Sequence, residues 1–125
     1  MTISRLGKGP RMSQAVICGG IVRLAGQIGS GATVGEQTKD MLASVDRWLA
    51  EAGTDKSHLL SATIWLADMD RFDEMNAVWD GWIDPENAPA RACVQARLAL
   101  PHFLVEAMVT AAIPPEETGA KRQVP

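Results

Sequence analysis

Arg91 and Glu106 are charged residues in a mostly apolar stretch of the sequence, "PARACVQARLALPHFLVEAMV". A guanidinium is a planar fork suited to bidentate binding of a carboxylate, and a partly desolvated glutamate can position or activate water. If the two halves of this stretch pair as strands about a turn near Pro101, both side chains could lie on one side of a sheet. The pattern fits either a site for a small acid or an ion pair, between strands or between subunits, and the sequence leaves both open.

Cys93 follows Arg91 by two residues and shares its face of an extended chain. A nucleophilic cysteine needs a base or a positive field, and Arg91 could supply part of that field. His58 and His102 fall in expected turns, and nothing ties either of them to Cys93. We therefore favour Cys93 as a small buried apolar group. Cys18, the other cysteine, forms no CxxC motif and no metal-ligand pattern, so neither a disulfide framework nor a metal site is predicted.

The charge and composition of the chain disfavour nucleic-acid and membrane partners. The net charge of −3 gives no basic surface for phosphates, which disfavours a nucleic-acid partner. The four tryptophans fit apolar stripes better than a base-stacking platform, since no basic residues interleave with them. The N-terminus lacks the apolar segment of a signal peptide, and no apolar run approaches 18 residues, so no membrane partner is expected. Free cysteines and these features favour a cytoplasmic protein.

Hydrophobic periodicity predicts the order β-β-β-α-β-α-β-β. Gly19-Gly20 between branched residues is a hairpin signal. A stripe of apolar residues predicts a helix over 35–52, with Thr33 and Glu36 at capping-box spacing and Gly53 just beyond its end. A second stripe predicts a helix in "DRFDEMNAVWDGWI". The strands are expected near residues 3–7, on both sides of Gly19-Gly20, in "HLLSATIWLADM", and near residues 91–98 and 104–112.

Two amphipathic helices and a mixed sheet predict a two-layer α+β domain with both helices on one face. We expect a single domain over residues 1–113 and a flexible tail over 114–125. The strands carry apolar residues on both sides, although no helix remains for the second face of the sheet. Another subunit is expected to cover that face, which predicts a homo-oligomer.

The assembled motifs resemble the reactive-intermediate deaminase family, also called RidA or YjgF-like proteins. The resemblance spans nearly the whole chain, through "GPRMSQAV", "LAGQIG", "SATIWLADMDRFDEMNAVWDGW", "PARACVQARL" and "LVEAMVTAAI". It implies a chorismate-mutase-like fold and a homotrimer with three clefts between neighbouring subunits. It also implies hydrolysis of enamines and imines such as 2-aminoacrylate to a 2-keto acid and ammonia, without metal or organic cofactor.

The resemblance also implies roles for particular residues. Arg91 would hold the substrate carboxylate and Glu106 would orient water, as the two catalytic residues. Gly26 and Cys93 would line the substrate pocket, and Asn76 matches a recurrent asparagine with a substrate-binding or structural role. One departure is visible: the chain contains no tyrosine where the family carries one after the N-terminal Gly-Pro, and "GPRMSQ" stands there instead. The pocket wall therefore differs. A carboxylate-binding module without catalysis, or less readily a ribonuclease, is the alternative function.

Overall fold

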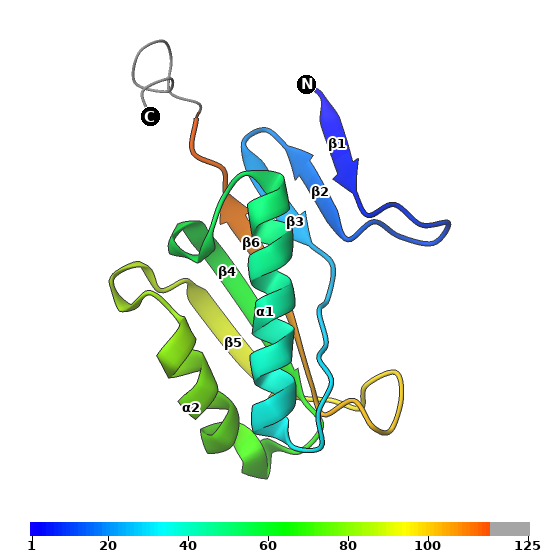
Figure 1. The fold of residues 1–125 in the computed structure, drawn as a ribbon, viewed down its shortest axis with the longest axis vertical. Coiled ribbons are helices and arrows are strands. Elements are labelled where there is room, and N and C mark those ends of the chain that lie inside the picture. Colours follow the sequence, from blue (N-terminus) through cyan, green and yellow to red (C-terminus); the bar gives the residue numbers. More distant parts are fainter. Residues whose placement is uncertain (116–125) are drawn as a thin grey trace.

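The structure, a computed structural model, describes residues 1–115, which form an α+β fold (Figure 1). The order of its main elements confirms the predicted one. Most of the expected tail, residues 116–125, lies outside the described residues. The elements are β1 (Ile3–Leu6), β2 (Ala15–Cys18), β3 (Ile21–Leu24), α1 (Val34–Ala52), β4 (Leu59–Leu66), α2 (Phe72–Trp82), β5 (Ala90–Gln95) and β6 (Val105–Ala112), with short 3-10 turns at Lys56–His58, Met69–Arg71 and Pro85–Asn87.

Local signals place the turns and helix ends as predicted. Gly19 and Gly20 have φ of 64° and 79° and connect β2 to β3, in the left-handed region that a two-residue hairpin turn requires. The Thr33 hydroxyl accepts from the Glu36 N–H at 3.1 Å at the start of α1. The helix ends at Gly53 with φ of 91°. The capping box is modified, because the Glu36 carboxylate accepts from the N–H of Ala32 and not of Thr33.

The six strands form one sheet in the order β1-β2-β3-β6-β4-β5. Among these strands only β4 and β5 pair in parallel. The connection between them contains α2, which returns the chain to the end of the sheet where β4 begins. β6 inserts between β3 and β4, and is antiparallel to both. The direct pairing of the last two strands, which the sequence left open, does not occur, because β4 separates β5 from β6.

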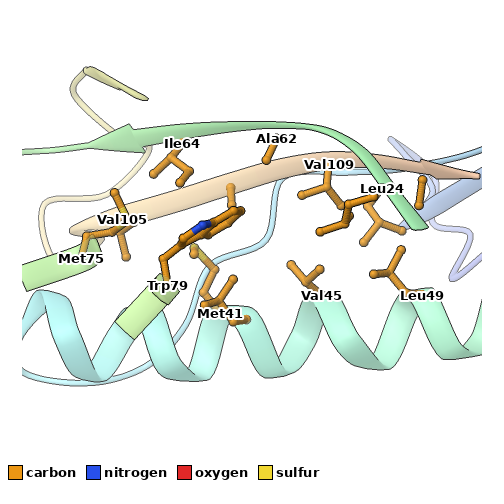
Figure 2. Packing of buried hydrophobic residues seen from close by; sticks show 14 of the residues in the cluster. Leu24, Met41, Val45, Leu49, Ala62, Ile64, Met75, Trp79, Val105 and Val109 are labelled. Atoms are coloured by element: carbon orange, nitrogen blue, oxygen red, sulfur yellow. The ribbon is translucent and has the colours of Figure 1, made fainter. Parts of the chain in front are cut away.

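Both helices pack on one face of the sheet, as predicted, and the core lies between the layers (Figure 2). Fully buried side chains of α1 meet buried residues of the central strands, among them Met41, Val45, Leu49, Leu24, Ile64 and Val109. On the other face, which we call the open face, Val94 and Met108 are 44% and 45% exposed. Neither helix of the described residues is long and apolar enough to cross a bilayer.

Candidate functional site

Arg91 is held by three neutral side chains of α2. It stands opposite Ala62 of β4, on the helix-covered side of the sheet. One guanidinium N–H donates to the Asn76 side-chain oxygen at 2.8 Å. The guanidinium carbon lies 5.1 Å from the ring centroid of Trp79 and 6.0 Å from that of Phe72. These separations are those of cation–π contacts, so an amide and two aromatic rings together fix the position of the cation.

We call these three side chains the Arg91 seat, and their spacing explains why one helix can supply all of them. Phe72, Asn76 and Trp79 occur at i, i+4 and i+7, so they share one side of α2. Trp79 is also part of the core, which limits how far the seat can move. In residues 1–115 no carboxylate lies within 4.0 Å of Arg91. The positive charge is thus oriented without being neutralised, which suits capture of an anion.

Glu106 lies on the open face. It pairs with Trp65 of β4, and its neighbours Val105 and Ala107 are buried on the helix side. A Cβ added at Gly26 would overlap the Glu106 carboxylate and come within 2.9 Å of its Cδ. Gly26 therefore lacks a side chain where the carboxylate needs the space. Within residues 1–115, the Glu106 side chain forms no hydrogen bond or ion pair with another side chain.

Gln27 fixes the segment that crosses Glu106, a role that the sequence analysis missed. Its backbone exchanges two hydrogen bonds with Ala107, of 2.7 and 3.0 Å. Its buried side-chain amide donates to the Gln14 side-chain oxygen at 2.9 Å. Gln14 ends the "GPRMSQ" stretch, so the segment that departs from the family pattern adjoins this site. A polar residue directly after Gly26 was the available signal.

The two expected catalytic residues are not brought together within one chain. Their partners on β4, Ala62 for Arg91 and Trp65 for Glu106, are an odd number of positions apart, so the two side chains leave opposite faces of the sheet. The shared side that direct pairing of the two strands would have allowed does not occur, and neither does an ion pair between strands of one chain. An ion pair or a site formed across subunits remains compatible with this geometry.

Cys93 belongs to the Arg91 side of the sheet. It stands opposite Ile64 and packs against the hydrophobic core. Burial raises the pKa of the Cys93 thiol, and the charge of Arg91 opposes this rise only in part. The thiol is therefore mostly protonated at neutral pH, as expected for a small apolar group and not for a nucleophile.

The remaining candidate residues lie elsewhere. His58 Nδ1 lies 3.0 Å from the Asp55 carboxylate and His102 packs on Phe103, so neither histidine serves Cys93. A cavity of about 790 Å³ opens under the loop that follows β5, but neither Arg91 nor Glu106 lines it. In the part of the chain that the structure describes, no three histidine, cysteine or acidic side chains gather as metal ligands.

Comparison with known proteins gives the family. The model of the family described as "Endoribonuclease L-PSP" matches residues 2–113. The chain belongs to this family, whose members are also called YjgF or RutC family proteins. A RutC family protein of Haemophilus ducreyi is 43% identical over 113 residues, which cover 89% of this chain and 97% of that protein. RutC family protein YoaB of Escherichia coli is 40% identical and is covered in full.

Solved structures of YjgF family proteins share the fold. NMB1025 of Neisseria meningitidis is 49% identical and has a TM-score of 0.91, with 92% of this chain and 98% of that chain covered. Rv2704 of Mycobacterium tuberculosis is 26% identical with a TM-score of 0.83. These likenesses confirm the predicted family and the α+β chorismate-mutase-like architecture. Within that fold, the chain presents an oriented cation on one face and a carboxylate over a glycine on the other.

Proposed function

We propose that this protein is a cofactor-free hydrolytic deaminase of reactive enamines and imines of the 2-aminoacrylate type. The observation that carries the proposal is the seat of Arg91, a cation held by Asn76 and Trp79 with no carboxylate partner in residues 1–115. Such a cation suits a substrate whose carboxylate lies next to the reacting carbon. Membership in the YjgF family supports this choice.

In the proposed reaction, Arg91 binds the carboxylate of the 2-imino acid that forms when 2-aminoacrylate takes a proton on its terminal carbon. A water molecule near Glu106 attacks the iminium carbon and gives its proton to the Glu106 carboxylate. The protonated Glu106 returns this proton to the carbinolamine nitrogen, and ammonia leaves as the C–N bond breaks. The hydroxyl group loses its proton to solvent as it becomes the carbonyl of the 2-keto acid. The 2-keto acid leaves with its carboxylate unchanged, and the balance requires only water.

The proposal places the reaction between two subunits of a homotrimer, in three equivalent clefts. Because Arg91 and Glu106 leave opposite faces of one sheet, a single ligand can meet both only if they come from different copies. The exposed apolar side chains of the open face, such as Met108 and Val94, support burial of that face against another copy. Gly26 and Cys93 would then line opposite walls of the same cleft, and the cytoplasm would be its compartment.

The test is hydrolysis of 2-aminoacrylate generated in the cuvette, with release of the keto acid and ammonia followed against the spontaneous reaction. Acceleration that saturates with substrate is expected from the wild-type protein. Several imino acids should be compared, because "GPRMSQ" alters the region next to Gln27. If none of them is hydrolysed faster than in buffer, the deaminase proposal fails.

A second candidate is a binding module for small 2-keto acids without turnover. The same observation favours it, because Arg91 is fully oriented within one chain while Glu106 is not beside it. Calorimetry with 2-oxobutyrate would then show binding in a protein that fails the hydrolysis assay. RNA cleavage, which the family description suggests, is disfavoured by the net charge of −3. Degradation of RNA that disappears in Arg91→Ala would reverse this judgement.

A further inference from the structure

The outer surface of the helical layer contains a second cavity, of about 360 Å³, which we call the α1/α2 groove. This volume lies at the lower end of the range for small-molecule sites. The groove lies on the helix side of the sheet, and its lining contains none of the residues that contact Arg91. Its lining residues come from α1, α2 and the turn before β4: Lys39, Leu42, Lys56, Ala77, Val78, Gly81 and Trp82.

Trp82 forms a fixed aromatic wall of this groove. Its indole N–H donates to the Asp46 carboxylate of α1 at 2.9 Å. Its ring also contacts Trp79 at a centroid distance of 5.3 Å and an interplanar angle of 56°. The Nζ of Lys56 lies 5.1 Å from the Trp82 centroid. An indole held on two sides and approached by a cation is a preorganised surface for a flat apolar group.

Gly81 borders open space in the groove. A Cβ added there would meet no atom within 4 Å, and its φ is not in the left-handed region. The backbone therefore does not require glycine, and glycine within a helix is less favourable than alanine. Packing does not explain this residue. Because Gly81 has no side chain, space remains free beside Val78 and Trp82.

The charges at the groove favour an anion. Lys39 and Lys56 both line it, and in residues 1–115 neither has a carboxylate within 4.0 Å of its amine. The pKa of Asp84 is lowered chiefly by hydrogen bonds from Asn87 and Glu86, with only a minor part from Lys56. Asp46 already accepts from Trp82. Two lysines beside an apolar floor thus stand out in a chain with a net charge of −3.

We propose that the α1/α2 groove binds a small organic anion with a flat aromatic body, of the aryl carboxylate class. The aromatic body packs on Trp82 and Val78 in the space left by Gly81. The carboxylate lies between Lys39 and Lys56. This site includes neither Arg91 nor Glu106, so binding at the groove is independent of the deaminase activity.

A titration of the ¹⁵N-labelled full chain with 1-naphthoate tests the proposal. Saturable shifts are expected at the Trp82 indole N–H and the Gly81 amide, and they should persist in Arg91→Ala. Gly81→Leu should weaken binding at least about tenfold by filling the space, whereas Gly81→Ala, too small to fill it, should still bind. The double variant Lys39→Met/Lys56→Met should weaken binding about tenfold, with Lys8→Met as the unaffected control.

The uncharged analogue 1-naphthamide and the purely anionic hexaglutamate separate the contributions. Weak or absent binding of both is expected, because each supplies only half of the required chemistry. Equal binding of the amide would overturn the role of the lysines. Shifts that vanish in Arg91→Ala, or that survive unchanged in Gly81→Leu, would place the ligand elsewhere and overturn the groove as its site. Hexaglutamate binding without naphthoate binding would indicate an acidic protein partner and would also overturn the proposal.

Discussion

The two faces of the sheet differ in how they hold a charged residue. On the covered face, Arg91 has a hydrogen bond to Asn76 and lies against the Trp79 ring, so its position is set within one chain. On the open face, Glu106 has room because of Gly26 but has no partner side chain in residues 1–115. The helices of the same chain cover one face of the sheet, whereas the other face presents a carboxylate and exposed apolar residues.

This difference indicates that the chain carries two half-sites and no complete one. A cation without a base can bind an acid but cannot activate water, and a carboxylate without a cation lacks the substrate anchor. The proposed trimer joins them by placing the Arg91 side of one copy near the Glu106 side of the next.

Loss of the open-face contact should abolish both assembly and activity. In Met108→Lys, a symmetric interface would have to bury an unpaired charge in each copy, so the variant should be monomeric and inactive. Light scattering after gel filtration measures the mass, and the 2-aminoacrylate assay measures turnover. Ala43→Lys, at an exposed position of α1, is the matched control and should remain trimeric. A trimeric Met108→Lys would show that the copies meet elsewhere.

Subunit mixing tests whether one cleft uses two chains. Glu106→Gln alone should lower kcat by about 10²- to 10⁴-fold, since the proton acceptor is lost while Arg91 still binds. Arg91→Ala and Glu106→Gln, refolded together in equal amounts, should recover about a quarter of the wild-type activity, because random assembly gives that share of clefts an intact pair. If the site used both residues of one chain, the mixture would stay as inactive as its components.

Removing the cation should have a smaller and separable effect. Arg91→Ala loses a charge-assisted contact worth on the order of 1.5–3 kcal/mol, so kcat/KM should fall about ten- to a hundredfold. Arg91→Lys should recover little, because an ammonium cannot reproduce the planar fork. The melting temperature and the trimer mass should stay near those of the wild type. Unchanged affinity for 2-oxobutyrate together with a weakened trimer would instead show that Arg91 serves the interface.

The sequence predicted the elements of this fold because their signals are local. The stripe of α1, the Gly19-Gly20 turn and the alternation of β4 each depend on neighbouring residues. The pairing of β6 with β3 and β4 depends on the whole sheet, so the sequence did not reveal that β4 separates Arg91 from Glu106. β5 also ends at Gln95, earlier than expected, because its partner β4 ends at Leu66.

The expected roles of the site residues came from the family resemblance, whereas their contacts depend on how the elements pack. Gly26 was expected near the pocket, and the structure places it against Glu106. Trp79 was expected only as a core residue, and it is buried, but it also lies against the Arg91 guanidinium. That second role depends on how α2 is rotated over β5, which hydrophobic periodicity does not specify. Asn76 was expected in a substrate-binding or structural role, and it contacts Arg91.

The smallest predicted effect concerns the neutrality of the Arg91 seat. Asn76→Asp keeps the shape of the side chain but places a carboxylate about where the amide oxygen now lies, 2.8 Å from the guanidinium. The new ion pair is stronger than the neutral hydrogen bond, so a substrate carboxylate must compete with it. Affinity for 2-oxobutyrate, measured by calorimetry, should fall about tenfold, while the melting temperature stays the same or rises.

Asn76→Ala is the matched control for this effect. It removes one hydrogen bond of about 1 kcal/mol but leaves the cation on Trp79 and Phe72 without a counter-ion, so affinity should fall only about fivefold. A seat that merely stabilises the fold predicts the reverse order, with Asn76→Asp binding at least as well as wild type and Asn76→Ala lowering the melting temperature most. The two variants are therefore ranked once by affinity and once by melting temperature. The two rankings together decide whether the neutral residues around Arg91 serve ligand binding or packing.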